Sequence, residues 1–190
     1  MPTSSTTRQL GAALRMLGVL TVLLGVLYPA AVWGVGRVSL SHQADGSRVE
    51  RGGAVVGSSL LGQDFHGDRW FASRPSASSY DGDVSGGTNL YSSSADQAKA
   101  VRERAAAYRA AYGTQAPADA LTASASGLDP HISPANAQAQ VRRVAAARGL
   151  PDASVARLVE QHVQGRTLGF LGEPRVNVLE LNLALERISR

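Results

Sequence analysis

The longest apolar stretch of the chain lies near its start, where residues 16–36 contain no charged side chain. As a helix that rises about 1.5 Å per residue, this stretch spans roughly 31 Å, the thickness of the hydrocarbon core of a bilayer. Arg15 and Arg37 flank it, and Tyr28 and Trp33 lie toward one end, as is typical of aromatic rings at the headgroup level. The pattern predicts one transmembrane helix over 16–36.

A cleaved signal peptide is the competing interpretation of this stretch. Such peptides have an apolar core of about 7–15 residues, followed by a small-x-small cleavage site. The stretch here is longer, and near its far end only Gly34-Val35-Gly36 could serve as such a site. We therefore predict a permanent anchor, preceded by a short basic tail over residues 1–15.

Small residues recur along one face of the predicted helix. Gly11, Gly18 and Gly25 are seven residues apart, and Thr21 lies between the last two. Inside lipid, a face of small residues lets a neighbouring helix approach closely. The spacing predicts that Gly18, Thr21 and Gly25 pack against a partner helix, although glycine is also common in membrane helices in general.

The remainder of the chain is long enough for one soluble domain with its own hydrophobic core. Residues 37–56 are polar and glycine-rich, so we expect a juxtamembrane linker that leads to a first strand. Residues 57–190 then form the domain. Within it, residues 76–94 are rich in Ser, Gly, Asp and Asn, and we expect an ordered surface loop there.

Capping signals predict helices in the second half of the chain. Ser94 and Gln97 have the spacing of a capping box, for a helix that stops at Gly113. Ser133 caps a further helix with proline at its first position, and this helix runs to Arg148. Both helices are expected to end at a glycine.

The last part of the chain mixes helix and strand signals. Asp152 is expected to cap a helix that continues to His162 or Val163, and residues 166–171 have the pattern of a strand. Asn177 then begins a C-terminal helix. Together these elements predict an α/β (α+β) soluble domain with one N-terminal transmembrane helix.

Charge excludes one class of partner and indicates an orientation. The tail and anchor hold Arg8, Arg15 and Arg37, so the 16 basic residues after position 40 nearly balance the 15 acidic ones. Nucleic-acid binding would need clustered basic residues with interleaved aromatics, so we expect no nucleic-acid partner. Counted by Lys and Arg alone, as the positive-inside rule requires, the two sides of the helix nearly tie. The favoured orientation holds the short basic tail, which has no acidic residue, inside the cell and makes the domain extracytoplasmic.

The chain contains no cysteine, which excludes disulfides, thiol nucleophiles and cysteine-ligated zinc.

Ser126, Asp129 and His131 suggest a hydrolase triad, but triad members normally come from separate elements, and no Gly-x-Ser-x-Gly elbow occurs. A turn that leads into the Ser133 cap is the favoured interpretation. A membrane-anchored extracytoplasmic hydrolase that uses these three residues stays open as the alternative.

A glycine-containing loop, Ser85, Gly86, Gly87 and Thr88, is a candidate nucleotide contact, because backbone N–H groups in such loops can face an anion. It lacks the Lys-Ser/Thr of a P-loop, so a flexible turn is favoured.

The histidines lack the spacing of a metal site. We expect no metal and no tightly bound cofactor, with ATP reached only through a larger complex.

Six blocks of sequence, taken together and in order, resemble one family. They are residues 57–63, 70–77, 85–90, 124–133, 140–145 and 175–182. Following one N-terminal membrane helix, they resemble the C subunit of the bacterial potassium-importing P-type ATPase, the KdpC family. The resemblance covers nearly the whole chain.

The resemblance implies an accessory subunit of a cell-membrane complex, without catalysis by this chain alone; no Asp-Lys-Thr-Gly phosphorylation motif is present. Its implied partners are a potassium-channel-like subunit, a P-type ATPase subunit and membrane lipid, with a small single-helix subunit as a further candidate. Ser126, Gly127, Asp129 and His131 are the expected docking loop.

Two roles are implied for such a subunit. One is a catalytic chaperone that raises the ATP affinity of the ATPase subunit, through a Ser-Gly-Gly stretch comparable to the signature loop of ABC ATPases. Here Thr88 stands where that loop has Gln. The other is a domain outside the membrane that stabilises the channel-like subunit. A domain outside cannot meet cytoplasmic ATP, so the expected orientation favours the stabilising role.

Overall fold

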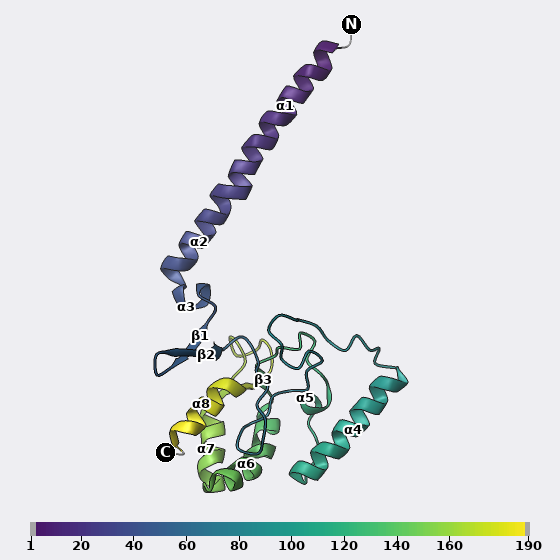
Figure 1. The fold of residues 1–190 in the computed structure, drawn as a ribbon, viewed down its shortest axis with the longest axis vertical. Coiled ribbons are helices and arrows are strands. Elements are labelled where there is room, and N and C mark those ends of the chain that lie inside the picture. Colours follow the sequence, from purple (N-terminus) through teal and green to yellow (C-terminus); the bar gives the residue numbers. More distant parts are fainter. Residues whose placement is uncertain (1–2, 189–190) are drawn as a thin grey trace. The chain divides into compact units, whose positions relative to one another are not determined.

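The computed structural model describes residues 3–188. They divide into two compact units, which meet in the sequence between Arg48 and Val49. The first unit is mainly one continuous helix, made of α1 (Thr3–Val22), the π-helical turn η1 (Leu23–Leu27) and α2 (Tyr28–Ser39) (Figure 1). A short helix, α3 (Ser41–Ala44), follows it.

The helix extends beyond both ends of the predicted 16–36 span. Residues 5–39 have a mean hydropathy of 2.1 in their most apolar window, and they are long and apolar enough to cross a membrane. None of that window is buried within the described part of the chain. The predicted basic tail is therefore helical from Thr3, because the Leu- and Ala-rich residues before Met16 favour helix as well.

The π-helical turn ends two residues before a proline, Pro29. The Tyr28 N–H donates to the Leu23 carbonyl, five residues back. Pro29 has no N–H, and in an α-helix its ring would collide with the carbonyl four residues before it. The widened turn accommodates the ring without breaking the helix.

The second unit begins with a hairpin of β1 (Arg48–Arg51) and β2 (Ala54–Ser58). Gly52 and Gly53 connect the strands with φ of 58° and 82°, and two positive φ angles match the twist of a tight hairpin. The predicted linker over 37–56 therefore contains a short helix and most of this hairpin.

A small antiparallel sheet lies at the centre of the second unit, with strand order β3-β5-β4. Its strands are β3 (His131–Ile132), β5 (Arg175–Asn177) and β4 (Val163–Gln164). Val176 of the central strand pairs with Ile132 on one side and Val163 on the other, and its side chain is fully buried.

The described part of the second unit also contains five helices: α4 (Ala95–Tyr112), α5 (Ala118–Leu121), α6 (Pro134–Arg148), α7 (Asp152–Gln161) and α8 (Val178–Ile188). Helix α7 contacts both α6 and α8, whereas α4 lies at the edge of the unit, against α5 and α6 (Figure 1). The core is formed by Phe71 with apolar side chains of the sheet and of α6, α7 and α8. The α/β (α+β) fold class is confirmed.

The predicted helix caps are confirmed at three positions. Ser94 Oγ accepts from the Gln97 N–H at 3.0 Å, and Ser133 Oγ accepts from the Asn136 N–H at 3.1 Å. The Asn177 side chain accepts from the N–H three residues later, at 3.1 Å. As expected, α4 and α6 end at glycines with positive φ, and residues 76–94, which the structure describes throughout, form a loop without helix or strand.

Two predictions at the end of the chain are wrong. Asp152 is the first residue of α7 rather than its cap, and Pro151 stands at the cap without a side-chain hydrogen bond. Residues 166–171 form a turn rather than a strand, and β4 ends before them, at Gln164. Leu168 and Gly169 have φ of 54° and 83°, so the backbone reverses there instead of continuing extended.

Candidate functional site

Two of the sequence motifs, more than 35 residues apart in the chain, lie against each other. The Gly86 N–H donates to the Ser126 carbonyl at 2.9 Å, and Ser85 Oγ donates to the same oxygen at 3.2 Å. A Cβ added to Gly87 would lie 3.1 Å from the Ala125 carbonyl oxygen. Gly87 thus allows two backbones to approach closely. We call this region, residues 57–65, 72–90 and 122–131, the loop cluster.

Gly127 is a second close contact in the loop cluster. Its φ of 72° favours glycine, and an added Cβ would overlap Ser78 Oγ and lie 2.9 Å from the Gly86 carbonyl oxygen. Its carbonyl accepts from Ser76 Oγ at 2.7 Å, and its N–H donates to Ser124 Oγ at 3.1 Å. Gly127 therefore joins its own loop to the loop that contains Ser76.

Asp129 is the charged centre of the loop cluster. Arg74 Nη1 donates to one carboxylate oxygen at 2.8 Å, and the His131 N–H donates to the other at 3.0 Å. Partial burial alone would raise the pKa of Asp129, but the hydrogen bonds from His131 and Arg74 outweigh burial and lower it to about 2. The carboxylate is therefore ionised at neutral pH.

Tyr80 closes the cluster beside this ion pair. Its hydroxyl donates to the Arg74 carbonyl at 2.7 Å, and burial raises its pKa to about 12. Gly62 fits between the two, since an added Cβ would lie 2.5 Å from both the Tyr80 ring and the Asp129 carbonyl oxygen. The Gly62 N–H also donates to the Leu128 carbonyl at 2.8 Å. All three loops are thus joined by backbone hydrogen bonds.

The hydrogen bonds of Ser126, Asp129 and His131 are those of a turn. Ser126 Oγ accepts from the Leu128 N–H at 3.1 Å and lies 3.2 Å from Ser124 Oγ. His131 Nδ1 lies 3.6 Å from Asp129, but the described hydrogen bonds include none between Ser126 and His131. The Asp129 carboxylate binds Arg74 as well as His131. The structure therefore does not assemble these residues as a triad.

The candidate nucleotide loop, Ser85 to Thr88, shares its backbone with this packing. A phosphate would have to compete with the Ser126 carbonyl for the Gly86 N–H, and Arg74 of the same loop cluster pairs with Asp129. Within residues 3–188 no group of three His, Asp or Glu side chains could hold a metal ion. The contacts of Ser85 and Gly86 with Ser126 are therefore packing contacts between two loops.

Four amide side chains of α6, β5 and α8 are buried, and of these the sequence singled out only Asn177, as a helix cap. They are Asn136, Gln140, Asn177 and Asn182. Asn182 donates to the Phe71 carbonyl at 3.0 Å and accepts from the Phe71 N–H at 2.9 Å. Gln140 makes the same pair of bonds with Ala72, at 3.1 and 2.7 Å.

Asn182 and Gln140 thus bind the backbone of Phe71 and Ala72 as a neighbouring strand would. Asn177 similarly donates to the Ser59 carbonyl at 2.8 Å. A signal was present in the sequence, because Asn182 stands four residues after Val178 and three before Leu185, where the helical period places core residues. A polar amide at such a position indicates a buried hydrogen-bonding partner.

The predicted packing face of the membrane helix is open in the described part of the chain. A Cβ added to Gly18 would meet nothing within 4 Å, and one added to Gly25 would meet only Thr21 Cγ2, at 3.9 Å. A shallow apolar groove begins at Gly18 and is lined by residues of the following two turns, Val19, Val22, Leu23 and Leu27.

Within residues 3–188 these features define a class of protein: one mixed α/β domain and one helix of membrane-spanning length and hydropathy. The family model described as "KdpC: K+-transporting ATPase, c chain" matches residues 10–187. The chain therefore belongs to the KdpC family and is a component of a potassium-transporting complex, which confirms the resemblance seen in the sequence.

Individual relatives agree with this assignment, and each carries the name "Potassium-transporting ATPase KdpC subunit". The protein from Kineococcus radiotolerans is 57% identical over 184 residues, which cover 94% of this chain and 93% of the relative. That from Sorangium cellulosum is 53% identical over 180 residues, with 92% and 95% covered. That from Mycobacterium bovis is 48% identical over 187 residues, with 95% and 99% covered.

Proposed function

We propose that this chain assembles and stabilises the potassium-transporting complex without performing chemistry itself. Its membrane helix packs against a helix of a partner subunit, and its domain docks on the channel-like subunit outside the membrane. The observation that carries this proposal is the apolar helix, of which none of the most apolar window is buried within the described chain. A single exposed helix with a face of small residues gains stability by packing against other membrane helices.

The contact face on the helix is formed by Gly18, Thr21 and Gly25. Gly18 supports this choice, because a Cβ added there would meet nothing within 4 Å, which leaves a partner side chain room beside the backbone. Thr21 and Gly25 lie next to each other on the helix, with 3.9 Å between Thr21 Cγ2 and a Cβ added at Gly25. The hydroxyl of Thr21 also offers a hydrogen bond inside lipid, where unpaired polar groups are unfavourable.

The docking surface on the domain is the segment Ser126, Gly127, Asp129 and His131. The loop cluster supports this role because its backbone hydrogen bonds and the Arg74–Asp129 pair hold the segment in one conformation. A preorganised loop loses little conformational entropy on binding, which favours a stable subunit contact.

The test of the helix face is the recovery of the complex from membranes that contain all its subunits. Gly18→Leu and Gly25→Leu should each reduce recovery of the other subunits with this chain about tenfold, since a bulky side chain separates the two helices. Ala13→Leu is the matched control. Ala13 precedes Gly18 by five residues, and a rotation of about 100° per residue places it roughly 140° from Gly18 around the same helix. Equal losses in all three variants, or no loss in any, would contradict the proposal.

The chaperone role is the alternative within the same family. Whether this chain binds ATP by itself distinguishes the chaperone role from the stabilising role. If Ser85 to Thr88 bind ATP, millimolar ATP should raise the melting temperature of the full chain in detergent. We expect no shift, because the Gly86 N–H already binds Ser126. A clear rise that disappears in Gly86→Pro would instead support direct nucleotide contact.

The hydrolase alternative is tested at His131. In the stabilising role, His131→Ala weakens assembly or transport, and neither the wild type nor the variant hydrolyses ester or amide substrates. A hydrolytic activity of the wild type that His131→Ala abolishes would favour the hydrolase.

A further inference from the structure

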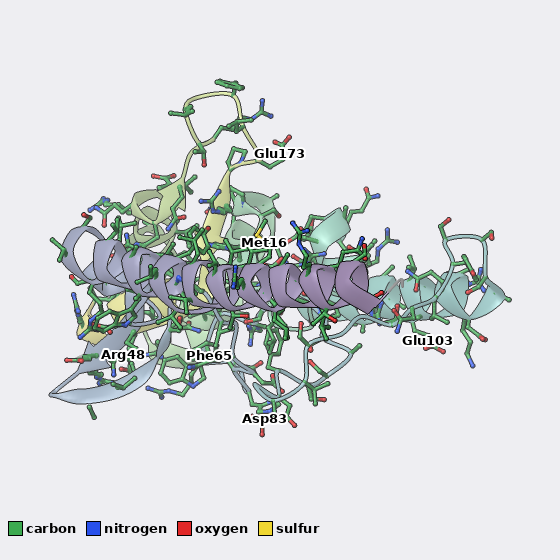
Figure 2. All side chains as sticks on the ribbon, turned by 90° about the horizontal axis from the view of Figure 1, so that it is seen from above. Met16, Arg48, Phe65, Asp83, Glu103 and Glu173 are labelled. Atoms are coloured by element: carbon green, nitrogen blue, oxygen red, sulfur yellow. The ribbon has the colours of Figure 1, made fainter. Side chains whose placement is uncertain are left out.

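The loop between β4 and β5 carries three large apolar side chains at its tip. Leu168, Phe170 and Leu171 are 79%, 69% and 49% exposed. Figure 2 shows this loop standing clear of the domain, with Glu173 labelled at its base. We call residues 166–173 the β4–β5 tip. Ordinary loops expose polar residues, so a tip that presents Leu, Phe and Leu together needs an explanation.

The β4–β5 tip has a fixed conformation although it stands apart. The Thr167 N–H donates to the Leu171 carbonyl and the Leu171 N–H to the Thr167 carbonyl, both at 2.9 Å. Arg166 Nη2 pairs with Glu173 Oε2 at 2.7 Å across its base. Leu168 adopts a φ of 54°, which residues with a side chain rarely adopt. The shape is therefore set by local hydrogen bonds, and it directs apolar side chains outward.

The charges of the β4–β5 tip indicate what kind of surface it fits. Residues 167–172 are uncharged, and Arg166 and Glu173 neutralise each other below them. Attraction to anionic lipid headgroups needs clustered Lys and Arg, which this loop does not have. Fluid lipid also requires no fixed shape. An apolar pocket of a folded protein accounts for both the neutral charge and the fixed conformation.

We propose that the β4–β5 tip inserts Leu168 and Phe170 into an apolar pocket on another subunit of the potassium-transporting complex. This inference rests on the proposed assembly function and deepens it by naming a contact. A few apolar or aromatic anchors surrounded by a polar rim are typical of the residues that dominate a protein interface. Here the Arg166–Glu173 pair forms that rim on one side.

Photo-crosslinking in the intact complex tests the contact. A benzophenone amino acid replaces Phe170 in the full chain, and the complex is purified through a tag on another subunit and irradiated. We expect a covalent product between this chain and one of the large subunits, identified by mass spectrometry. The same replacement of Tyr91, which is 82% exposed in the 76–94 loop, is the control and should give far less product.

The alternative results of this experiment are distinct. Products with lipid alone, no product, or equal products from Phe170 and Tyr91 would overturn the proposed contact. If the complex still assembles through this chain in those cases, the assembly function stands while the tip proposal fails. If the complex forms normally when the whole chain is deleted, the assembly function itself fails.

A double variant measures what the tip contributes. Leu168→Ser with Phe170→Ser should reduce recovery of the complex about tenfold, whereas Tyr91→Ser should leave it unchanged. The melting temperature of the purified variant should stay unchanged, because both side chains point away from the core. Full recovery of the complex with the double variant would contradict the proposal. If the double variant does not fold, the cross-linking result at Phe170 decides between the outcomes.

Discussion

Glycines of the loop cluster show how single residues decide the arrangement of whole loops. Gly62, Gly87 and Gly127 each lie where an added Cβ would come close to a backbone carbonyl of a neighbouring loop. The Ser-Gly-Gly stretch invites comparison with a phosphate-binding loop, but Gly87 already has a structural reason to be there, because an added Cβ would lie 3.1 Å from the Ala125 carbonyl oxygen. Gly86 beside it donates its N–H to the Ser126 carbonyl.

Gly127→Ala tests this packing. We expect a loss of stability of about 2–4 kcal/mol, about 1 kcal/mol from the positive φ and the remainder from the collision with Ser78 and Gly86. Gly113→Ala is the matched control, since its φ is 68° but an added Cβ meets nothing within 4 Å. Thermal denaturation of the two variants measures the difference. Equal losses would mean that the close approach contributes nothing.

Asp129 contributes a stability that depends on pH. Its pKa is lowered from 3.8 to about 2 in the folded protein, so its contribution is complete above pH 4 and is lost as pH falls toward 2. Asp129→Asn should therefore cost about 2 kcal/mol at pH 7 and little at pH 2. Denaturation at both pH values measures this change, with the exposed Asp83→Asn as control. A cost that is the same at both pH values would contradict the assignment.

At the scale of the element, α6 and α4 are capped by the same residue type in different surroundings. Ser94 Oγ makes the capping bond to Gln97. Ser133 Oγ makes the equivalent bond and also donates to Asp119 Oδ1 at 2.8 Å. The cap of α6 therefore also connects this helix to α5, which contains Asp119.

Ser133→Ala should consequently destabilise the domain more than Ser94→Ala. A lost N-cap costs about 1 kcal/mol, and a lost bond to a charged carboxylate adds roughly another 1–2 kcal/mol. Chemical denaturation of the two variants gives the comparison. The opposite order would show that the bond to Asp119 does not stabilise the fold.

At the scale of the whole molecule, the side of the membrane on which the domain lies decides which roles are physically available. The chain contains no cysteine, so one introduced thiol reports its own location. Asp83→Cys, in the exposed 76–94 loop, should react with a membrane-impermeant maleimide in intact cells, and Gln9→Cys should react only after permeabilisation. The reverse pattern would place the domain in the cytoplasm and would reopen the chaperone role.

What the sequence determined by itself concerns features with local causes. The apolar run of residues 16–36 defines the membrane helix, and Ser94 and Ser133 mark helix starts, because hydropathy and capping act within a few residues. The six blocks in order also identified the family.

Only the tertiary structure decided which loops meet. The contacts of Gly86 with Ser126 and of Asn182 with Phe71 join residues 40 and 111 positions apart, and no local pattern encodes such pairs. The same reason explains the wrong strand at 166–171, whose alternating apolar residues suit a strand until Leu168 turns left-handed and the tip points away from the sheet. Local propensity sets the elements, whereas long-range packing selects where each one ends and what it touches.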